Sequence, residues 1–276
     1  MILDEIVKRA LCEDIRSGDL STQGAVSPLS SAQATLWSKS EGVIAGLGVV
    51  RQCFWELDPN VTFTPSVHDG KRVRKNTLIA EIAGNAHALL SAERVALNFL
   101  QRLSGIATET RKLVDAISPH SAQIIDTRKT TPGLRMLEKY AVRMGGGQNH
   151  RFALDDAVLL KENHIAAAGG IIPAIKKTRN RVGHTTFIQV EVSHLTGLED
   201  ALEAGVDAIL LDNMTLDELR EAVQQVNGRV ILEASGNITL VNAADIAATG
   251  VDLLSVGYVT HSPKALDVSL ILERIL

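Results

Sequence analysis

The fold is decided by six short aliphatic runs in the second half of the chain: AQIIDTRK (122–129), AVLLKENH (157–164), TFIQVEV (186–192), AILLDN (208–213), RVILEASG (229–236) and DLLSVGYV (252–259). Stretches with helical spacing of apolar residues separate these runs. Such alternation is typical of βα units and a parallel sheet. A closed eight-stranded barrel needs more strands than six. The pattern therefore predicts an open or incomplete parallel α/β barrel.

The first half of the chain has a different pattern. Residues 30 to 85 contain alternating stretches such as VTFTPSV and TLIAEIAG, with Asp69-Gly70 as a turn signal between them. A long helix follows, because Val95, Phe99, Leu103 and Ile106 keep the spacing of one buried face. We predict an N-terminal α/β domain over residues 1–103, the barrel over 104–265, and a C-terminal helix over 266–276 that packs back on the N-terminal domain.

The bulk composition excludes several classes of protein. Apolar residues make up 45% of the 276 residues and aromatic residues only 3%, so aliphatic side chains must fill the core. A formal net charge of -4 gives no support to a nucleic-acid surface. The two cysteines, Cys12 and Cys53, have no metal-ligand spacing. The charged N-terminus does not resemble a signal peptide and no run is long enough to cross a bilayer, so we expect a cytoplasmic protein.

Polar or glycine residues follow each of the six aliphatic runs. In parallel α/β barrels the active site lies at the carboxyl ends of the strands, on the βα loops. We therefore expect one site that collects Asp126 to Lys129, Lys161 to His164, Glu191, Asp212 with Asn213, Ser235 to Asn237, and Gly257.

The charges at this rim indicate the substrate. The cations are Arg128, Lys129, Arg151 and Lys161, and His150 can join them, whereas Glu191 and Asp212 are carboxylates. Arginine binds carboxylate or phosphate with a planar fork, and Mg²⁺ takes one or two protein carboxylates together with phosphate oxygens. The set predicts a polyanionic substrate with a divalent metal held by Glu191 and Asp212. The loops Ser235-Gly236-Asn237 and Gly257 can bring backbone N–H groups to a phosphate.

Several longer motifs carry a family resemblance: ALNFLQRLSGIAT, DTRKTTPGLR, GGGQNHR, LLKENH, VEV, LLDN, EASGNI and DLLSVGYVTHS occur in this order. Together they resemble the quinolinate phosphoribosyltransferases, through most of residues 87 to 262. The resemblance implies an α/β sandwich domain joined to an open seven-stranded α/β barrel. It also implies a Mg²⁺-dependent, decarboxylating transfer of phosphoribosyl to quinolinate in NAD biosynthesis, by a homodimer.

The resemblance also implies a role for each site residue. Arg94 resembles the arginine that reaches the neighbouring subunit's site. Arg128, His150 and Arg151 resemble the other quinolinate-binding groups, and Ser235, Gly236, Asn237 and Gly257 match the loops that bind the 5′-phosphate. Lys129, Lys161, Glu191 and Asp212 are the catalytic residues that it implies, with Lys129 as our choice for the proton donor to the product carbanion. One segment departs from the family: QVEVS keeps Glu191, but Gln189 and Ser193 stand where many members have acidic residues.

Three other functions stay open at this stage. A related pyrophosphorylase-like protein of molybdenum transport shares the fold, but such relatives generally lack the lysine of LLKENH, here Lys161. A Schiff-base barrel aldolase would use Lys161 as its nucleophile. A non-catalytic regulator that binds a sugar phosphate need not keep both carboxylates and the whole cationic set.

Overall fold

The computed structural model describes residues 2–275, which form two compact units. Of the described residues, the first unit combines 2–111, 131–146 and 260–275, and the second combines 112–130 and 147–259. These limits differ from the predicted boundaries. Residues 131–146, which contain helix α5 (Arg135–Met144), belong to the first unit and not to the barrel.

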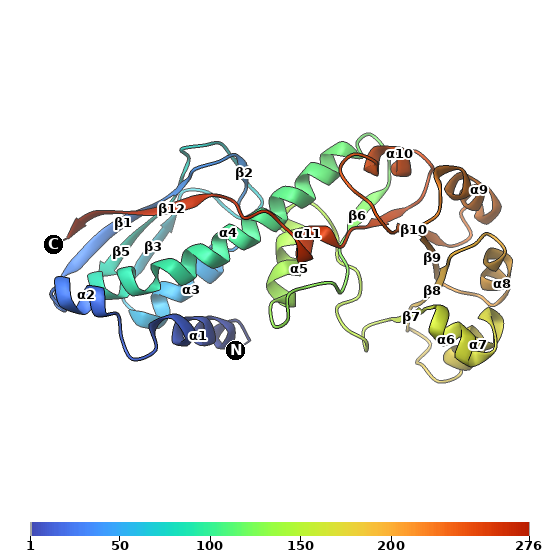
Figure 1. Ribbon diagram of the computed structural model, residues 1–276, viewed down its shortest axis with the longest axis horizontal. Coiled ribbons are helices and arrows are strands. Elements are labelled where there is room, and N and C mark those ends of the chain that lie inside the picture. The colour runs from blue at the N-terminus through green and yellow to red at the C-terminus, as the bar shows by residue number, and fades with distance from the viewer. Residues whose placement is uncertain (1, 276) are drawn as a thin grey trace. The chain divides into compact units, whose positions relative to one another are not determined.

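A four-stranded antiparallel sheet forms the centre of the first unit, in the order β12-β1-β5-β3 (Figure 1). Its strands are β12 (Val268–Ile275), β1 (Ser31–Ser38), β5 (Leu78–Asn85) and β3 (Thr62–Pro65). Ala32, Ala34 and Leu36 alternate with more exposed residues along β1, so one face of the sheet is buried. A two-stranded ribbon of β2 (Gly42–Val43) and β4 (Arg72–Val73) accompanies it.

The C-terminal helix predicted for residues 266–276 is wrong, because β12 occupies residues 268–275 and pairs antiparallel with β1. The segment VSLILERI contains both apolar and charged residues at spacings that suit either a helix or a strand. The free edge of β1 decides between them, since pairing with it satisfies the backbone groups of both strands.

The first unit also contains helices α1 (Ile2–Ile15), α2 (Leu20–Ala25) and α3 (Leu47–Leu57), and residues 86–111 of the long helix α4 (Ala86–Ala116). The helix α4 binds neighbouring backbone with its own polar side chains: Ser104 Oγ accepts from the Ala45 N–H at 3.0 Å, and Thr108 Oγ1 from the Val43 N–H at 2.9 Å. The helix therefore fixes the segment between β2 and α3.

A buried ion pair links α4 to α5 within the same unit. Arg102 Nη2 lies 2.6 Å from Glu138 Oε1, and the Glu138 side chain is fully buried. The same nitrogen donates to Thr131 Oγ1 at 2.6 Å and to the Thr260 carbonyl at 3.0 Å. One guanidinium thus ties together three segments that are far apart in sequence.

The second unit contains a six-stranded parallel sheet in the order β6-β11-β10-β9-β8-β7. The strands match the six predicted runs: β6 (Gln123–Ile125), β7 (Val158–Leu160), β8 (Ile188–Val192), β9 (Ala208–Asp212), β10 (Ile231–Ser235) and β11 (Leu253–Ser255). The sheet is open, because β6 and β7 are its edges. Residues 2–275 do not supply the seventh strand implied by the resemblance, although a single parallel bridge joins Ile125 to Gln148 beside β6.

Helices connect these strands and lie along the outer side of the curved sheet in Figure 1. They are α6 (Glu162–Ala168), α7 (Ile171–Arg179), α8 (Gly197–Glu203), α9 (Leu216–Val226) and α10 (Ala243–Ala247). The short α11 (Tyr258–His261) follows β11 and leads out of this sheet toward β12. The capping box of α9, in which Thr215 and Glu218 bond each other's backbone N–H, ends the loop after β9. Among the residues that the structure describes, no helix is long and apolar enough to cross a membrane.

Replacing Glu138 by Leu should lower the free energy of unfolding by about 3 kcal/mol, because it leaves the Arg102 guanidinium without its carboxylate. Urea unfolding measures the change. The matched control is Asp217→Asn, which breaks the exposed pair with Arg220 and should cost under about 1 kcal/mol. Equal costs for the two variants would contradict a structural role for the buried pair.

Candidate active site

The strand register of the second unit places polar side chains on one face of the sheet. Glu191 lies opposite Leu210, Asp212 opposite Ser235, and Ser235 opposite Ser255. Paired residues of parallel strands point to the same side, so these groups share a face. The alternate residues are aliphatic and buried on the other face, among them Ile209, Leu211, Leu232, Ala234 and Leu254.

A cavity of about 350 Å³ lies on this polar face, within the second unit. Most of the residues predicted from the sequence line it: Arg128, Lys129, His150, Arg151, Lys161, Glu191, Asp212 and Ser235. Leu159 and Leu210 supply apolar surface. The structure therefore brings this set together around one cavity, and the roles of its members remain predictions.

The remaining predicted residues lie outside the lining of this cavity. Gly236 and Asn237 have positive φ angles of 98° and 51°, and the Asn237 amide donates to Asn213 Oδ1 at 3.1 Å. A Cβ on Gly236 would collide with the Asn213 side chain, so this position requires glycine. Gly257 follows β11. Arg94 lies exposed on α4 in the first unit, so its role remains a prediction.

An ion pair joins the ends of β7 and β8. Lys161 Nζ lies 2.5 Å from Glu191 Oε2. Schiff-base formation requires an amine that is free to attack a carbonyl carbon, whereas this one is held against a carboxylate. The pairing therefore favours Lys161 as a fixed positive charge over Lys161 as a nucleophile.

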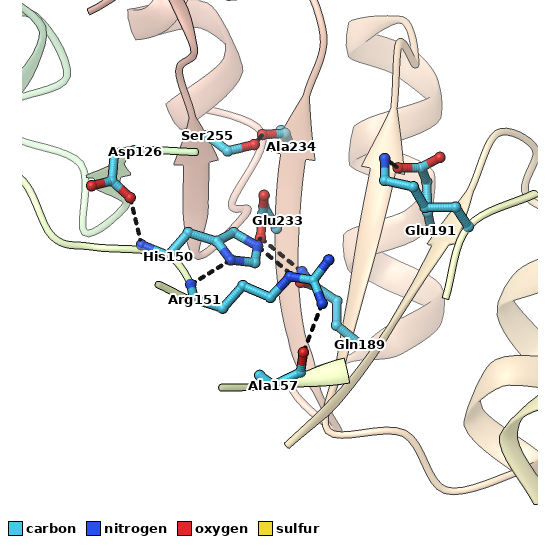
Figure 2. Close-up of polar contacts among 10 residues, drawn as sticks. Asp126, His150, Arg151, Ala157, Gln189, Glu191, Glu233, Ala234 and Ser255 are labelled. Carbon is cyan, nitrogen blue, oxygen red and sulfur yellow. Dashed lines mark hydrogen bonds and ion pairs between the residues drawn. The ribbon is translucent and has the colours of Figure 1, made fainter. Parts of the chain in front are cut away.

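Arg151 lies beside a second cation. Burial lowers the pKa of its guanidinium below the ordinary value, the positive charge of Arg128 lowers it further, and Asp156 partly opposes both effects. The side chain is held by a 2.7 Å hydrogen bond from Nη1 to the Ala157 carbonyl (Figure 2). Two guanidinium groups that repel each other in a half-buried site favour an anion between them.

The segment that carries His150 and Arg151 is fixed by Asp126, at the end of β6. This carboxylate is fully buried and accepts from the His150 backbone N–H at 2.8 Å and from the Asn149 side-chain amide at 2.7 Å. Asp126 thus positions the backbone of His150, as Figure 2 shows, and the side chain of Asn149.

The floor of the cavity is formed by Glu233, whose side chain is only 2% exposed. Gln189 Nε2 donates to its Oε2 at 2.7 Å, and His150 Nε2 lies 3.4 Å from the same oxygen. Burial alone would raise the pKa of this carboxyl group. The interactions with His150, with smaller contributions from Ser255 and Gln189, outweigh burial and hold the pKa below its ordinary value.

Glu191 and Asp212 are the cavity residues that could hold a divalent cation. The described residues contain no group of three or more His, Cys, Asp or Glu side chains arranged for a metal. Mg²⁺ commonly uses only one or two carboxylates and completes its shell with substrate phosphates and water. Two carboxylates on adjacent strand ends, one of them also paired with Lys161, fit a cation that arrives with a diphosphate.

Comparison with protein families covers nearly the whole chain. The N-terminal domain of quinolinate phosphoribosyl transferase matches residues 19–104, and the C-terminal domain of the same family matches residues 106–271. The chain belongs to the quinolinate phosphoribosyltransferase family.

Relatives and solved structures of this family are similar to this chain over nearly its whole length. A probable nicotinate-nucleotide pyrophosphorylase (carboxylating) of Bacillus subtilis is 46% identical, over 97% of this chain and 92% of that protein. A mitochondrial quinolinate phosphoribosyltransferase (decarboxylating) of Nicotiana tabacum is 40% identical, over 97% of this chain and 81% of that protein. The crystal structure of NadC from Streptococcus pyogenes superposes with a TM-score of 0.95 at 44% identity and covers 99% of this chain and 97% of that one.

Sequence reasoning missed the roles of Asp126, Gln189 and Glu233 in this phosphoribosyltransferase. Glu233 and Gln189 stand inside strands that otherwise read as aliphatic. The two-residue period could have found Glu233, since it has the same parity as Ser235 and must share its face. Asp126 was expected in the site with the other polar residues, whereas its buried carboxylate binds the backbone of the loop that carries His150.

The lowered pKa of Glu233 makes a prediction about acid stability. A carboxyl group whose folded-state pKa is depressed stabilises the protein above the ordinary value of 4.5, and this stabilisation is lost as pH falls through the folded pKa. The wild type should therefore exceed Glu233→Gln in stability most at neutral pH, with the gap closing on acidification. Urea unfolding from about pH 7 to pH 3 measures it. A gap that widens toward acid would mean that Glu233 is protonated in the native state.

Proposed function

We propose that this protein transfers the phosphoribosyl group of phosphoribosyl diphosphate to quinolinate with decarboxylation. The products are nicotinate mononucleotide, CO2 and diphosphate, in de novo NAD biosynthesis. The observation that carries the proposal is one cavity that combines Arg128, Arg151, Lys129 and Lys161 with the carboxylates Glu191 and Asp212. The protein is thus a pentosyltransferase, a nicotinate-nucleotide diphosphorylase (carboxylating).

The cations of the cavity suit a substrate with two carboxylates. Arg128 and Arg151 can each bind a carboxylate of quinolinate with a planar pair of N–H groups. Lys129 and Lys161 add point charges that can face both quinolinate and the diphosphate. A site of this kind binds the dianion and turns its ring nitrogen toward the anomeric carbon of the second substrate.

The transfer forms a bond between the ring nitrogen and the anomeric carbon and breaks the bond from that carbon to the diphosphate. The anomeric carbon gains positive charge as the diphosphate leaves, and the Glu191 carboxylate can stabilise it. The quaternised ring then accepts the electron pair left when the 2-carboxylate departs as CO2. The carbanion takes up a proton, for which Lys129 is our choice of donor.

Magnesium, dimerisation and location complete the proposal. Glu191 and Asp212 would hold Mg²⁺, which when bound neutralises charge on the diphosphate. A homodimer would let Arg94 complete the site of the neighbouring subunit, as the resemblance implies. A cytoplasmic location remains our prediction from the sequence.

The alternatives are less well supported. The matched relatives are nicotinate-nucleotide pyrophosphorylases and quinolinate phosphoribosyltransferases, which does not favour a protein of molybdenum transport. The ion pair between Lys161 and Glu191 speaks against a Schiff-base aldolase.

The test is an assay of the purified protein with quinolinate, phosphoribosyl diphosphate and Mg²⁺ that follows nicotinate mononucleotide and CO2 together. Equal amounts of both products are expected, with neither formed when nicotinate replaces quinolinate or when the metal is chelated. Folded protein that forms neither product would contradict the proposal.

Arg151→Ala should weaken quinolinate binding about tenfold to a hundredfold, because it removes a charge-assisted contact worth about 1.5–3 kcal/mol. Calorimetric titration with quinolinate measures the affinity, and thermal unfolding checks that the fold persists. Arg220→Ala is the matched control, since Arg220 is exposed on α9 and pairs with Asp217. Unchanged quinolinate affinity in both Arg151→Ala and Arg128→Ala would remove these arginines from the site.

A further inference from the structure

A chain of hydrogen bonds leads from the buried floor of the cavity to the backbone of Arg151. Gln189 and Glu233 lie side by side, with Gln189 Nε2 2.7 Å from Glu233 Oε2. His150 Nε2 faces both, 3.1 Å from Gln189 Oε1 and 3.4 Å from Glu233 Oε2. On its other side, His150 Nδ1 lies 2.6 Å from the Arg151 backbone nitrogen (Figure 2).

These contacts determine where the imidazole proton lies. The backbone N–H of Arg151 can only donate, so Nδ1 of His150 must accept and carries no proton. The ring proton is therefore on Nε2, where it points at the Gln189 carbonyl oxygen and the Glu233 carboxylate. Both ring nitrogens are bonded within the protein, so these contacts hold the ring in place where it lines the cavity.

Packing alone does not hold the ring in this orientation. A second cavity, of about 320 Å³, is lined by Val158, Phe187 and Leu253 and also by His150, Arg151 and Glu233. The last three residues line the first cavity as well. They therefore lie between the two cavities. Because packing around the His150 ring is incomplete, hydrogen bonds must fix its orientation.

The polar contacts of the Glu233 carboxylate are concentrated on one of its two oxygens. Glu233 is buried, and its Oε1 has no hydrogen-bond partner. Its Oε2 accepts from Gln189 Nε2 and faces the Nε2–H of His150. The contacts of this carboxylate are therefore directed at the histidine and its neighbour.

We propose that Glu233 is a positioning residue, supported by Gln189 beside it. Glu233 fixes the Nε2–H tautomer and the ring plane of His150. The ring in turn fixes the backbone of Arg151, because His150 Nδ1 accepts from the Arg151 N–H. The Arg151 guanidinium, which lines the substrate cavity, is then attached to a backbone whose position is fixed. The arrangement is similar to other carboxylate–histidine pairs, in which a buried carboxylate selects one tautomer of the imidazole ring. The link to substrate rests on the proposed function, whereas the tautomer does not.

The tautomer is tested by nitrogen NMR of protein labelled with ¹⁵N-histidine, without substrate, with the His150 signals assigned from a His150→Gln variant. The wild type should show Nδ1 without a proton and Nε2 with one. Glu233→Leu should give a mixture of tautomers, and Glu233→Gln a smaller share of the second form, because an amide accepts more weakly than a carboxylate. Asp252→Asn is the control: it removes a charge that binds the Leu232 backbone at 2.8 Å in the same sheet and should leave the His150 signals unchanged.

Kinetics separate positioning from a merely structural role. The KM for quinolinate should rise roughly tenfold or more in Glu233→Leu, because displaced site groups lose about this much, while the KM for phosphoribosyl diphosphate changes far less. Glu233→Gln should recover part of the loss.

An unchanged His150 spectrum in the folded Glu233 variants would overturn the proposal. If Glu233→Leu does not fold, the spectrum of Glu233→Gln alone decides. A wild type with the expected spectrum but no activity would count against the proposed function and leave the tautomer assignment standing.

Discussion

The two-residue period of the parallel strands is the constraint on which the rest of the structure depends. On β8, β9 and β10 every second residue is aliphatic and buried, and the residues between them, Glu191, Asp212, Glu233 and Ser235, share the opposite face. A shift of one residue in the strand register would place these carboxylates in the aliphatic layer. Burying unpaired charges there would cost far more free energy than the shifted strands could recover. The hydrophobic layer therefore fixes the position of the chemistry.

Opposite charges then organise the polar face. The chain carries a net charge of -4, yet Arg128 and Arg151 lie close enough to lower the pKa of Arg151. Asp156 partly offsets their repulsion. Other carboxylates fix the neighbouring groups: Asp126 holds the backbone of the arginine-bearing loop, Glu191 pairs with Lys161, and Glu233 faces His150. Such a site is preorganised, since its cations are held by groups other than the ligand, and the substrate anion need not order them.

Much of the fold and of the site could be predicted from the sequence. Aliphatic runs marked all six parallel strands, and the residues that follow them, such as Lys161 and Asp212, line the cavity. The strand β12 was missed because its sequence suits two periods and its partner, β1, lies more than 200 residues earlier in the chain. The roles of Glu233 and Asp126 were missed for a related reason. The role of a buried carboxylate depends on its hydrogen-bond partners, and the partners of these two residues are distant in sequence and brought close only by the fold.

A crystal structure with quinolinate bound tests most directly the claim that this face of the sheet is a preorganised dianion site. The two carboxylates should lie within hydrogen-bond distance of the Arg128 and Arg151 guanidinium groups, with His150 still bonded through Nδ1 to the Arg151 backbone. Quinolinate bound away from both arginines, or a His150 ring turned to place a nitrogen on the substrate, would contradict it.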